Sequence, residues 1–124
     1  MVNPQKEDTQ DNMFLLGLKI ENIIEYIESK VLDAFFGYKH DGLESTSNLL
    51  NSLINWVWRL KKEIKDTSIL SSELSGTILK IVDRIDAGIR NLKIAVEDQA
   101  YEKGNKEIGK VLKAIREFYD LRKL

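Results

Sequence analysis

The chain has 124 residues, enough for one domain with an apolar core but too few for two independently stable domains. Hydrophobic residues make up 43% of the sequence and charged residues 31%, a balance typical of a folded globular protein and not of a disordered one. Nineteen basic and twenty acidic side chains leave a net charge of -1, which excludes an overall field that attracts nucleic acid or anionic lipid.

The absence of cysteine excludes disulfides, thiolate metal sites and a cysteine nucleophile. The polar start of the chain has no apolar signal core, and no apolar run approaches the length of a membrane span. We therefore expect a cytoplasmic protein that makes no contact with a membrane.

Residues 1–10 are polar and contain the only proline, so we expect a short mobile N-terminal tail. A first helix is predicted over about 11–36, with Asp11 or Asn12 as its cap. Its inward stripe repeats at spacings of three and four residues. The stripe consists of Leu16, Ile20, Ile23, Ile27, Val31, Ala34 and Tyr38.

Residues 37–42 predict a turn, because a glycine stands at each end of this segment. A second helix is predicted over about 43–65. Its seam consists of Leu43, Leu50, Leu53, Val57, Leu60 and Ile64.

A third helix is predicted over about 71–101, with Ser71 or Ser72 as its cap, and a start nearer Asp66 is the alternative. Its stripe alternates by fours and threes, which is the heptad spacing of helices packed at a shallow crossing angle. The stripe consists of Leu74, Ile78, Val82, Ile85, Ile89, Leu92 and Val96, with Ile81 beside it. Gly88 and Ala95 share one edge of this helix, where we expect a neighbouring helix to approach closely.

The polar segment around Tyr101–Asn105 contains Gly104 and predicts the last turn. A fourth helix over about 105–121 would bury Ile108, Val111, Leu112, Ile115, Phe118 and Tyr119. No period-two run indicates a strand. Four helices with short connections predict an all-α, single-domain, antiparallel four-helix up-down bundle.

The sequence offers no constellation for catalysis. The only histidine, His40, falls in a predicted turn with no partner motif, and no Glu-x-x-His sequence of a di-iron bundle occurs. A magnesium cage could be imagined from Glu21, Glu25, Glu28, Asp83 and Asp86, but these carboxylates lie outside the apolar stripes and are expected to be solvated. We therefore expect a non-enzymatic protein with no catalytic residue, no cofactor and no metal ion.

Surplus apolar surface is the positive functional signal. On the second helix Trp56 and Trp58 flank Val57 on opposite sides, so the apolar arc covers about 200°, twice the width of a minimal core-facing stripe. Apolar residues also occur on the far side of the first helix. The candidate interface consists of Phe14, Leu18, Leu32, Phe36 and Trp58.

We interpret this surface as that of a helical interaction module, such as an adaptor, a small subunit or a chaperone-like protein. The partner would be another protein chain, including a second copy in a homo-oligomer. In the competing interpretation the chain is a monomer whose tail and loops cover these residues.

A rival function is nucleic-acid binding by a subunit of a larger complex through the tryptophan and lysine end of the second helix. Here Arg59, Lys61, Lys62 and Lys65 accompany the two tryptophans. A second basic run, on the last helix, consists of Lys103, Lys106, Lys110 and Lys113. Interleaved acidic residues dilute both clusters, so this function ranks second and an enzyme third.

The order of a short tail, a long helical hairpin and a Lys-rich last helix ending in Ala114–Asp120 resembles the small bundle chaperones of bacterial flagellar export. The resemblance covers size and helix order and includes no specific motif. It implies binding to an unfolded or helical segment of a secreted partner.

Overall fold

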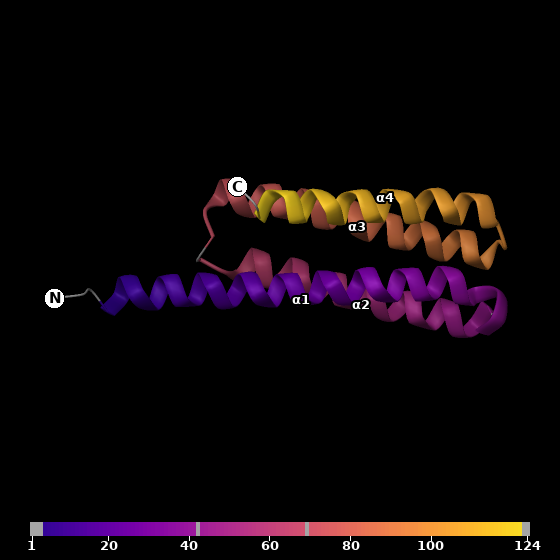
Figure 1. Ribbon diagram of the computed structural model, residues 1–124, viewed down its shortest axis with the longest axis horizontal. Helices are drawn as coiled ribbons and strands as arrows, with labels where there is room; N and C mark the ends of the chain where they lie inside the picture. The colour runs from indigo at the N-terminus through magenta and orange to yellow at the C-terminus, as the bar shows by residue number, and fades with distance from the viewer. Residues whose placement is uncertain (1–3, 42, 69, 123–124) are drawn as a thin grey trace.

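The computed structural model describes residues 4–41, 43–68 and 70–122, with all of their side chains except those of residues 4–14, 35, 37–41, 43 and 122. Four helices follow one another: α1 (Pro4–Asp41), α2 (Leu43–Asp66), α3 (Ser72–Glu97) and α4 (Tyr101–Arg122). Successive helices run in opposite directions along one long axis (Figure 1). Over the described residues there is no strand, and the predicted all-α four-helix bundle is confirmed.

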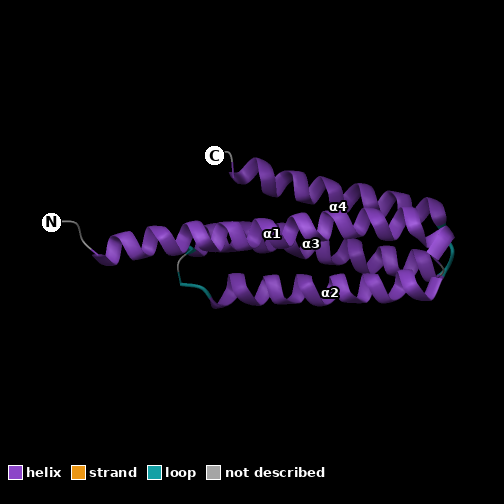
Figure 2. Ribbon diagram, turned by 60° about the horizontal axis from the view of Figure 1, so that its bottom comes forward, coloured by secondary structure: helices purple, strands orange, loops and turns teal. Residues whose placement is uncertain are grey.

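The helices pack in chain order, and α4 also contacts α1 and closes the bundle. The α3–α4 contact is the most extensive and the α1–α4 contact the sparsest. Helix α1 is the longest, with 38 residues, and its N-terminal part extends beyond the ends of the other helices (Figures 1 and 2). Within the described ranges, none of the helices combines the length and the apolar character needed to cross a lipid bilayer.

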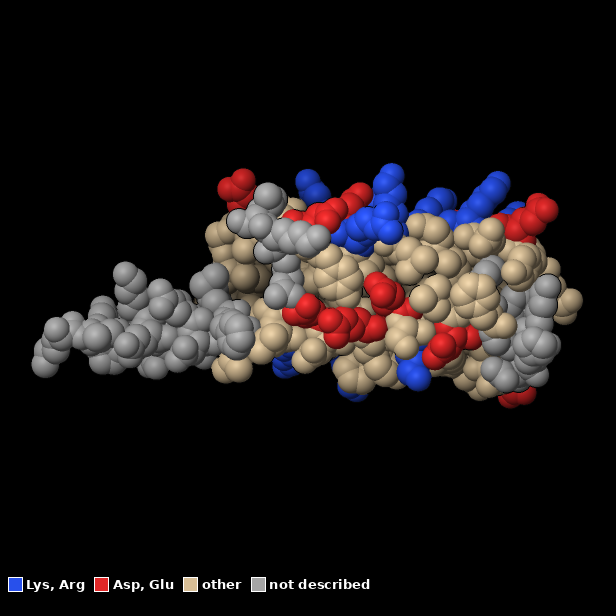
Figure 3. Space-filling view, viewed as in Figure 1, with Lys and Arg blue, Asp and Glu red and all other residues tan. Residues whose placement is uncertain are grey.

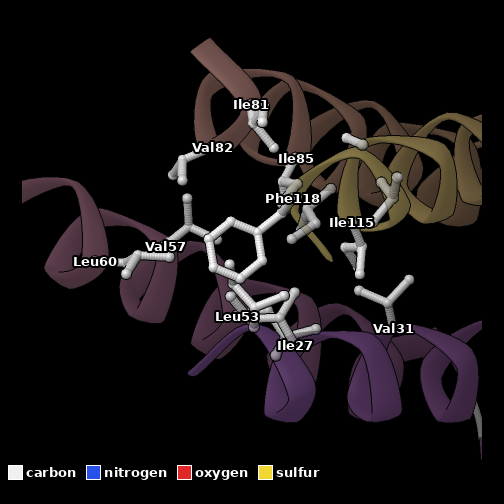
Figure 4. Packing of buried hydrophobic residues seen from close by; sticks show 14 of the residues in the cluster. Ile27, Val31, Leu53, Val57, Leu60, Ile81, Val82, Ile85, Ile115 and Phe118 are labelled. Atoms are coloured by element: carbon white, nitrogen blue, oxygen red, sulfur yellow. The ribbon is translucent and has the colours of Figure 1, made fainter. Parts of the chain in front are cut away.

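Apolar side chains from all four helices form one core. Figure 4 shows the ring of Phe118 from α4 among side chains of the other three helices, including Ile27, Leu53 and Ile85. The predicted seams of α2 and α3 are confirmed, because their central residues are fully or almost fully buried. The predicted stripe of α1 is confirmed at Leu16, Ile20, Ile27, Val31 and Ala34. It differs at one position, where Ile24 is fully buried and Ile23 lies at the edge of the core, and the side chain of Tyr38 lies outside the described residues.

Two boundaries of α1 differ from the prediction. The helix begins at Pro4, before the expected cap at Asp11 or Asn12, so the described part of the expected tail is helical. Proline suits a first helical position because its φ is already helical and that position needs no N–H. The helix also continues through Gly37 to Asp41, since a single glycine costs only about 1 kcal/mol in a helix and does not end one by itself.

The cap of α3 is as predicted, and its end is not. The Ser71 hydroxyl accepts a hydrogen bond from the backbone N–H of Leu74 at 3.1 Å, as an N-cap should. The last turn lies at 98–100 and not around Gly104, which is buried inside α4. Gln99 adopts a left-handed conformation with φ 55°, and the N–H of Ala100 donates to the carbonyl of Ala95 at 2.7 Å. This is a Schellman ending whose usual glycine is replaced by glutamine.

Gly88 permits the close contact between α3 and α4. It is buried, and a Cβ atom added to it would collide with Cγ2 of Val111 on α4. The absence of a side chain at this position therefore sets how closely the two helices approach, as the sequence predicted for Gly88.

Replacing Gly88 with alanine should push α4 away from α3. We expect Gly88→Ala to lower the free energy of unfolding by about 1–3 kcal/mol, the usual cost of overpacking a core. Gly109→Ala is the matched control, because a Cβ there meets nothing within 4 Å. It should raise stability by about 0.5–1 kcal/mol through its better helix propensity. Urea denaturation of both variants gives the comparison, and equal effects would contradict the assigned contact.

Candidate functional site

An open groove of 790 Å³ runs along α1 and α2. We call it the α1–α2 groove. Leu16 and Ile23 of α1 give it an apolar floor, because both side chains pack on the core. The remaining lining consists of Lys19 from α1, then Trp56, Trp58, Arg59, Lys62, Glu63 and Asp66 from α2, and Thr67 after α2.

The two tryptophans of the groove differ in exposure. Trp58 is 60% exposed, whereas Trp56 is half-buried and its ring contacts that of Tyr26 on α1, with 5.4 Å between centroids. Each indole has a cation beside it: the Arg59 guanidinium lies 5.5 Å from the Trp56 ring centre, and Lys62 Nζ lies 5.5 Å from that of Trp58. Trp56 therefore helps to hold α1 against α2, and Trp58 presents its ring to solvent.

An ion pair spans the two helices beside this groove. Lys19 Nζ of α1 donates to Glu63 Oε1 of α2 at 2.8 Å, and both side chains are exposed. Exposed ion pairs contribute little to stability, typically below about 1 kcal/mol, so this pair is easily exchanged for contacts with a ligand. The groove thus combines an apolar floor with a polar rim.

The structure separates the five predicted interface residues. Trp58 lines the α1–α2 groove, and Leu18 is 38% exposed on α1 without lining it. Leu32 is partly buried against the core, which corrects its expected exposure, because α1 turns that position toward the bundle. Phe36 is 67% exposed and lies near the other end of α1. Phe14 lies in α1, but its side chain is outside the described set.

The sequence pattern did not indicate the pair of Lys19 and Glu63, and it predicted Ile23 as a core residue and not as part of a groove floor. The pair joins residues 44 positions apart, so no local spacing could have indicated it. Leu15 was also missed, although it is 60% exposed and precedes Leu16 of the groove. The adjacent Leu15 and Leu16 were a usable signal, because two neighbouring residues of a helix cannot both face the core.

The carboxylates considered as a magnesium cage have another role. Lys61 Nζ lies 2.9 Å from Asp83 Oδ1 and 3.1 Å from Asp86 Oδ2, which joins α2 to α3. Arg90 Nε also donates to Asp86, at 3.1 Å. Asp83 is solvated as expected, whereas the Asp86 side chain is only 15% exposed because the two cations cover it. Where side chains are described, no group of three or more His, Cys, Asp or Glu residues is placed to hold a metal ion.

The charge of Lys61 is stabilised by this network. Burial disfavours its ammonium form, but the hydrogen bonds that Lys61 donates to Asp83 and Asp86, together with the negative charge of the two carboxylates, outweigh that effect and raise the pKa of Lys61 above 10.5. On the other side of α3, Arg84 pairs with Glu117 of α4, and the Arg84 guanidinium lowers the pKa of the Glu117 carboxyl. The Lys61 network joins α2 to α3, and the Arg84–Glu117 pair joins α3 to α4. Neither of them lines the α1–α2 groove.

No known protein family, curated protein or solved structure matches the chain.

Lys61→Met tests the network between α2 and α3. The apolar stem would be kept, but Asp86 would lose one of its two cations, so we expect a loss of about 1–2 kcal/mol in the free energy of unfolding at neutral pH. Because the folded-state pKa of Lys61 is raised, its contribution is complete below pH 10.5 and should be lost as the pH rises through that raised value.

Lys65→Met is the matched control, since Lys65 is exposed in the last turn of α2. It should change stability by less than about 0.5 kcal/mol. Denaturant titrations of both variants at neutral and at alkaline pH give the measurement. Equal losses in the two variants at neutral pH would show that the network does not join the helices.

Proposed function

We propose that this protein is a non-enzymatic interaction module that binds another protein chain in the α1–α2 groove. The observation that carries the proposal is Trp58, a large aromatic side chain that is 60% exposed beside an apolar groove floor. Tryptophan is among the residues that most often dominate binding energy when a partner desolvates them. We assign no catalytic, cofactor or metal role to any residue, and we place the protein in the cytoplasm as a working hypothesis.

The form of the groove favours a helical segment as the bound element. Its walls are two antiparallel helices, and its apolar floor is flanked by charged side chains of both signs. An amphipathic helix can place its apolar face on Leu16 and Ile23 and its polar edges toward Lys19 and Glu63. The occupant can be a different protein or a second copy of this chain.

Nucleic-acid binding at the same end of α2 is the alternative, and the contacts support it less well. Lys61 is engaged by Asp83 and Asp86, and Glu63 and Asp66 place negative charge in the groove. Arg59 and Lys62 already lie beside the indole rings, so a stacking base would have to displace them.

Trp58→Ala is the decisive change. We expect at least a tenfold weaker association, because an aromatic anchor commonly contributes about 2 kcal/mol or more. The helical circular-dichroism signal should be unchanged, because the ring lies outside the core. Sedimentation equilibrium over a range of concentrations measures self-association, and quantitative affinity capture from the host lysate measures other partners.

Ile94→Ala is the matched control, because Ile94 is an exposed apolar residue on α3, away from the α1–α2 groove. Proteins retained by the wild type and by Ile94→Ala but lost with Trp58→Ala support the proposal. A wild-type protein that sediments as a monomer and retains nothing sensitive to Trp58 would contradict it. Capture of nucleic acid that declines steeply with salt in the wild type and is lost in Trp58→Ala would favour the alternative.

A further inference from the structure

A second groove lies between α3 and α4, and its chemistry differs from that of the first. Two adjoining hollows of 250 and 330 Å³ share Asn91, Glu107 and Lys110, so they form one channel along the two helices. We call it the α3–α4 groove. Because the helices pack in chain order around the bundle, this groove lies on the side opposite the α1–α2 groove.

Positive charge is concentrated in the α3–α4 groove. Its lining contains five cations and two carboxylates, and one of the cations, Arg84, is paired with Glu117 of α4, which leaves a local charge of +2 in a chain whose net charge is -1. The cations are Arg84, Lys103, Lys106, Lys110 and Lys113, and the carboxylates are Asp98 and Glu107. Figure 3 shows lysine and arginine side chains gathered along the edge formed by α3 and α4, with carboxylates across the middle of the same face.

The four lysines form a row along α4. Their spacings of three, four and three residues keep them on one side of the helix, over a length of about 15 Å. Lys110 pairs with Glu107 at 3.2 Å, whereas Lys103, Lys106 and Lys113 make no ion pair within 4.0 Å among the described residues, although the charge of Lys113 helps to lower the pKa of Glu117. Three ammonium groups of the row are therefore available to an anionic ligand.

The rest of the lining distinguishes between classes of polyanion. Three small residues, Ala87, Gly88 and Ala95, also line the groove, and Ile94 is the one large apolar side chain among the described lining residues. Protein interfaces are poor in lysine and rich in apolar and aromatic residues, which is the opposite composition. Among the described residues no aromatic side chain lines the groove, so single strands find no stacking platform there.

We propose that the α3–α4 groove binds the phosphodiester backbone of a nucleic-acid duplex, without reading its sequence. Successive phosphates of one strand advance by about 3.4 Å along a duplex, so the lysine row spans about four of them. Lysine ammonium groups contact these phosphates, and the Asn91 amide donates a hydrogen bond to a phosphate oxygen. No described element projects from the α3–α4 groove far enough to contact the base edges of a bound duplex. Binding therefore depends on charge and not on sequence.

The test is fluorescence anisotropy of the full chain with a labelled 20-base-pair DNA duplex of mixed sequence at several salt concentrations. About four phosphate contacts predict a slope of about -3 to -4 in a plot of log K against log salt. Lys106→Gln combined with Lys113→Gln should reduce the magnitude of this slope by about 2. Lys30→Gln combined with Lys65→Gln is the matched control, because it removes the same charge from α1 and α2 and should leave the slope unchanged.

Glu107→Gln provides a change of opposite sign. Glu107 lines both hollows with a side chain that is 14% exposed, and its Oε2 has no hydrogen-bond partner among the described residues. The amide keeps an oxygen for Lys110 but removes the negative charge facing the phosphates, so duplex binding should become several-fold tighter. Glu25→Gln, at an exposed position of α1, changes the net charge equally and should have no such effect.

Three results would overturn the proposal. The first is a lack of saturable duplex binding at 50 mM salt. The second is an equal loss of duplex affinity in the two double lysine variants. The third is tighter binding of the single strand or of poly-glutamate than of the duplex. The last result would assign the groove to single strands or to an acidic protein.

Discussion

The packing of α3 against α4 is the constraint on which the rest of the structure depends. Because Gly88 has no side chain, the two helices approach closely, and Val111 occupies the space that a Cβ atom at position 88 would take. Helix α3 also packs extensively on α2, and the ions around Lys61 and Asp86 strengthen that contact. Helix α3 is therefore the centre of the bundle, because its buried stripe contacts neighbours on two sides at close range.

This arrangement leaves α1 as the least enclosed helix, which explains where the apolar groove lies. Helix α1 packs mainly on α2 and only sparsely on α4. Its side chains therefore do not fully cover the α2 surface, and Trp58 remains exposed. The charges are divided in a similar way: residues 4–41 contain four lysines and eight carboxylates, a charge of -4, while residues 101–122 contain six cations and four carboxylates, a charge of +2. The two proposed binding surfaces lie on opposite sides of the bundle. They also differ in their lining, because the α1–α2 groove contains two tryptophans and the described lining of the α3–α4 groove contains no aromatic residue.

Most of the fold could be predicted from the sequence, because heptad spacing on α3 and a clear seam on α2 determine which faces are buried. Helix ends were harder to predict, since glycine was taken as the mark of a turn. Gly37 and Gly104 both lie inside helices, whereas Gln99 makes the left-handed turn. The groove could be predicted only in part. Trp58 was found from its position opposite Trp56, but the Lys19–Glu63 pair and the channel over Gly88 arise from contacts between distant segments, which no local pattern reports.

Native-state hydrogen exchange tests the central claim most directly, because it measures the stability of each helix separately. If α3 is the centre of the bundle, the slowest amides should lie in its middle, around Ile85–Leu92, followed by those of α4 and α2 that face it. Amides of α1 should exchange faster, in keeping with its sparse contact with α4. Exchange from α1 that is as slow as exchange from the middle of α3 would contradict this account and would remove the reason for placing the binding groove on α1.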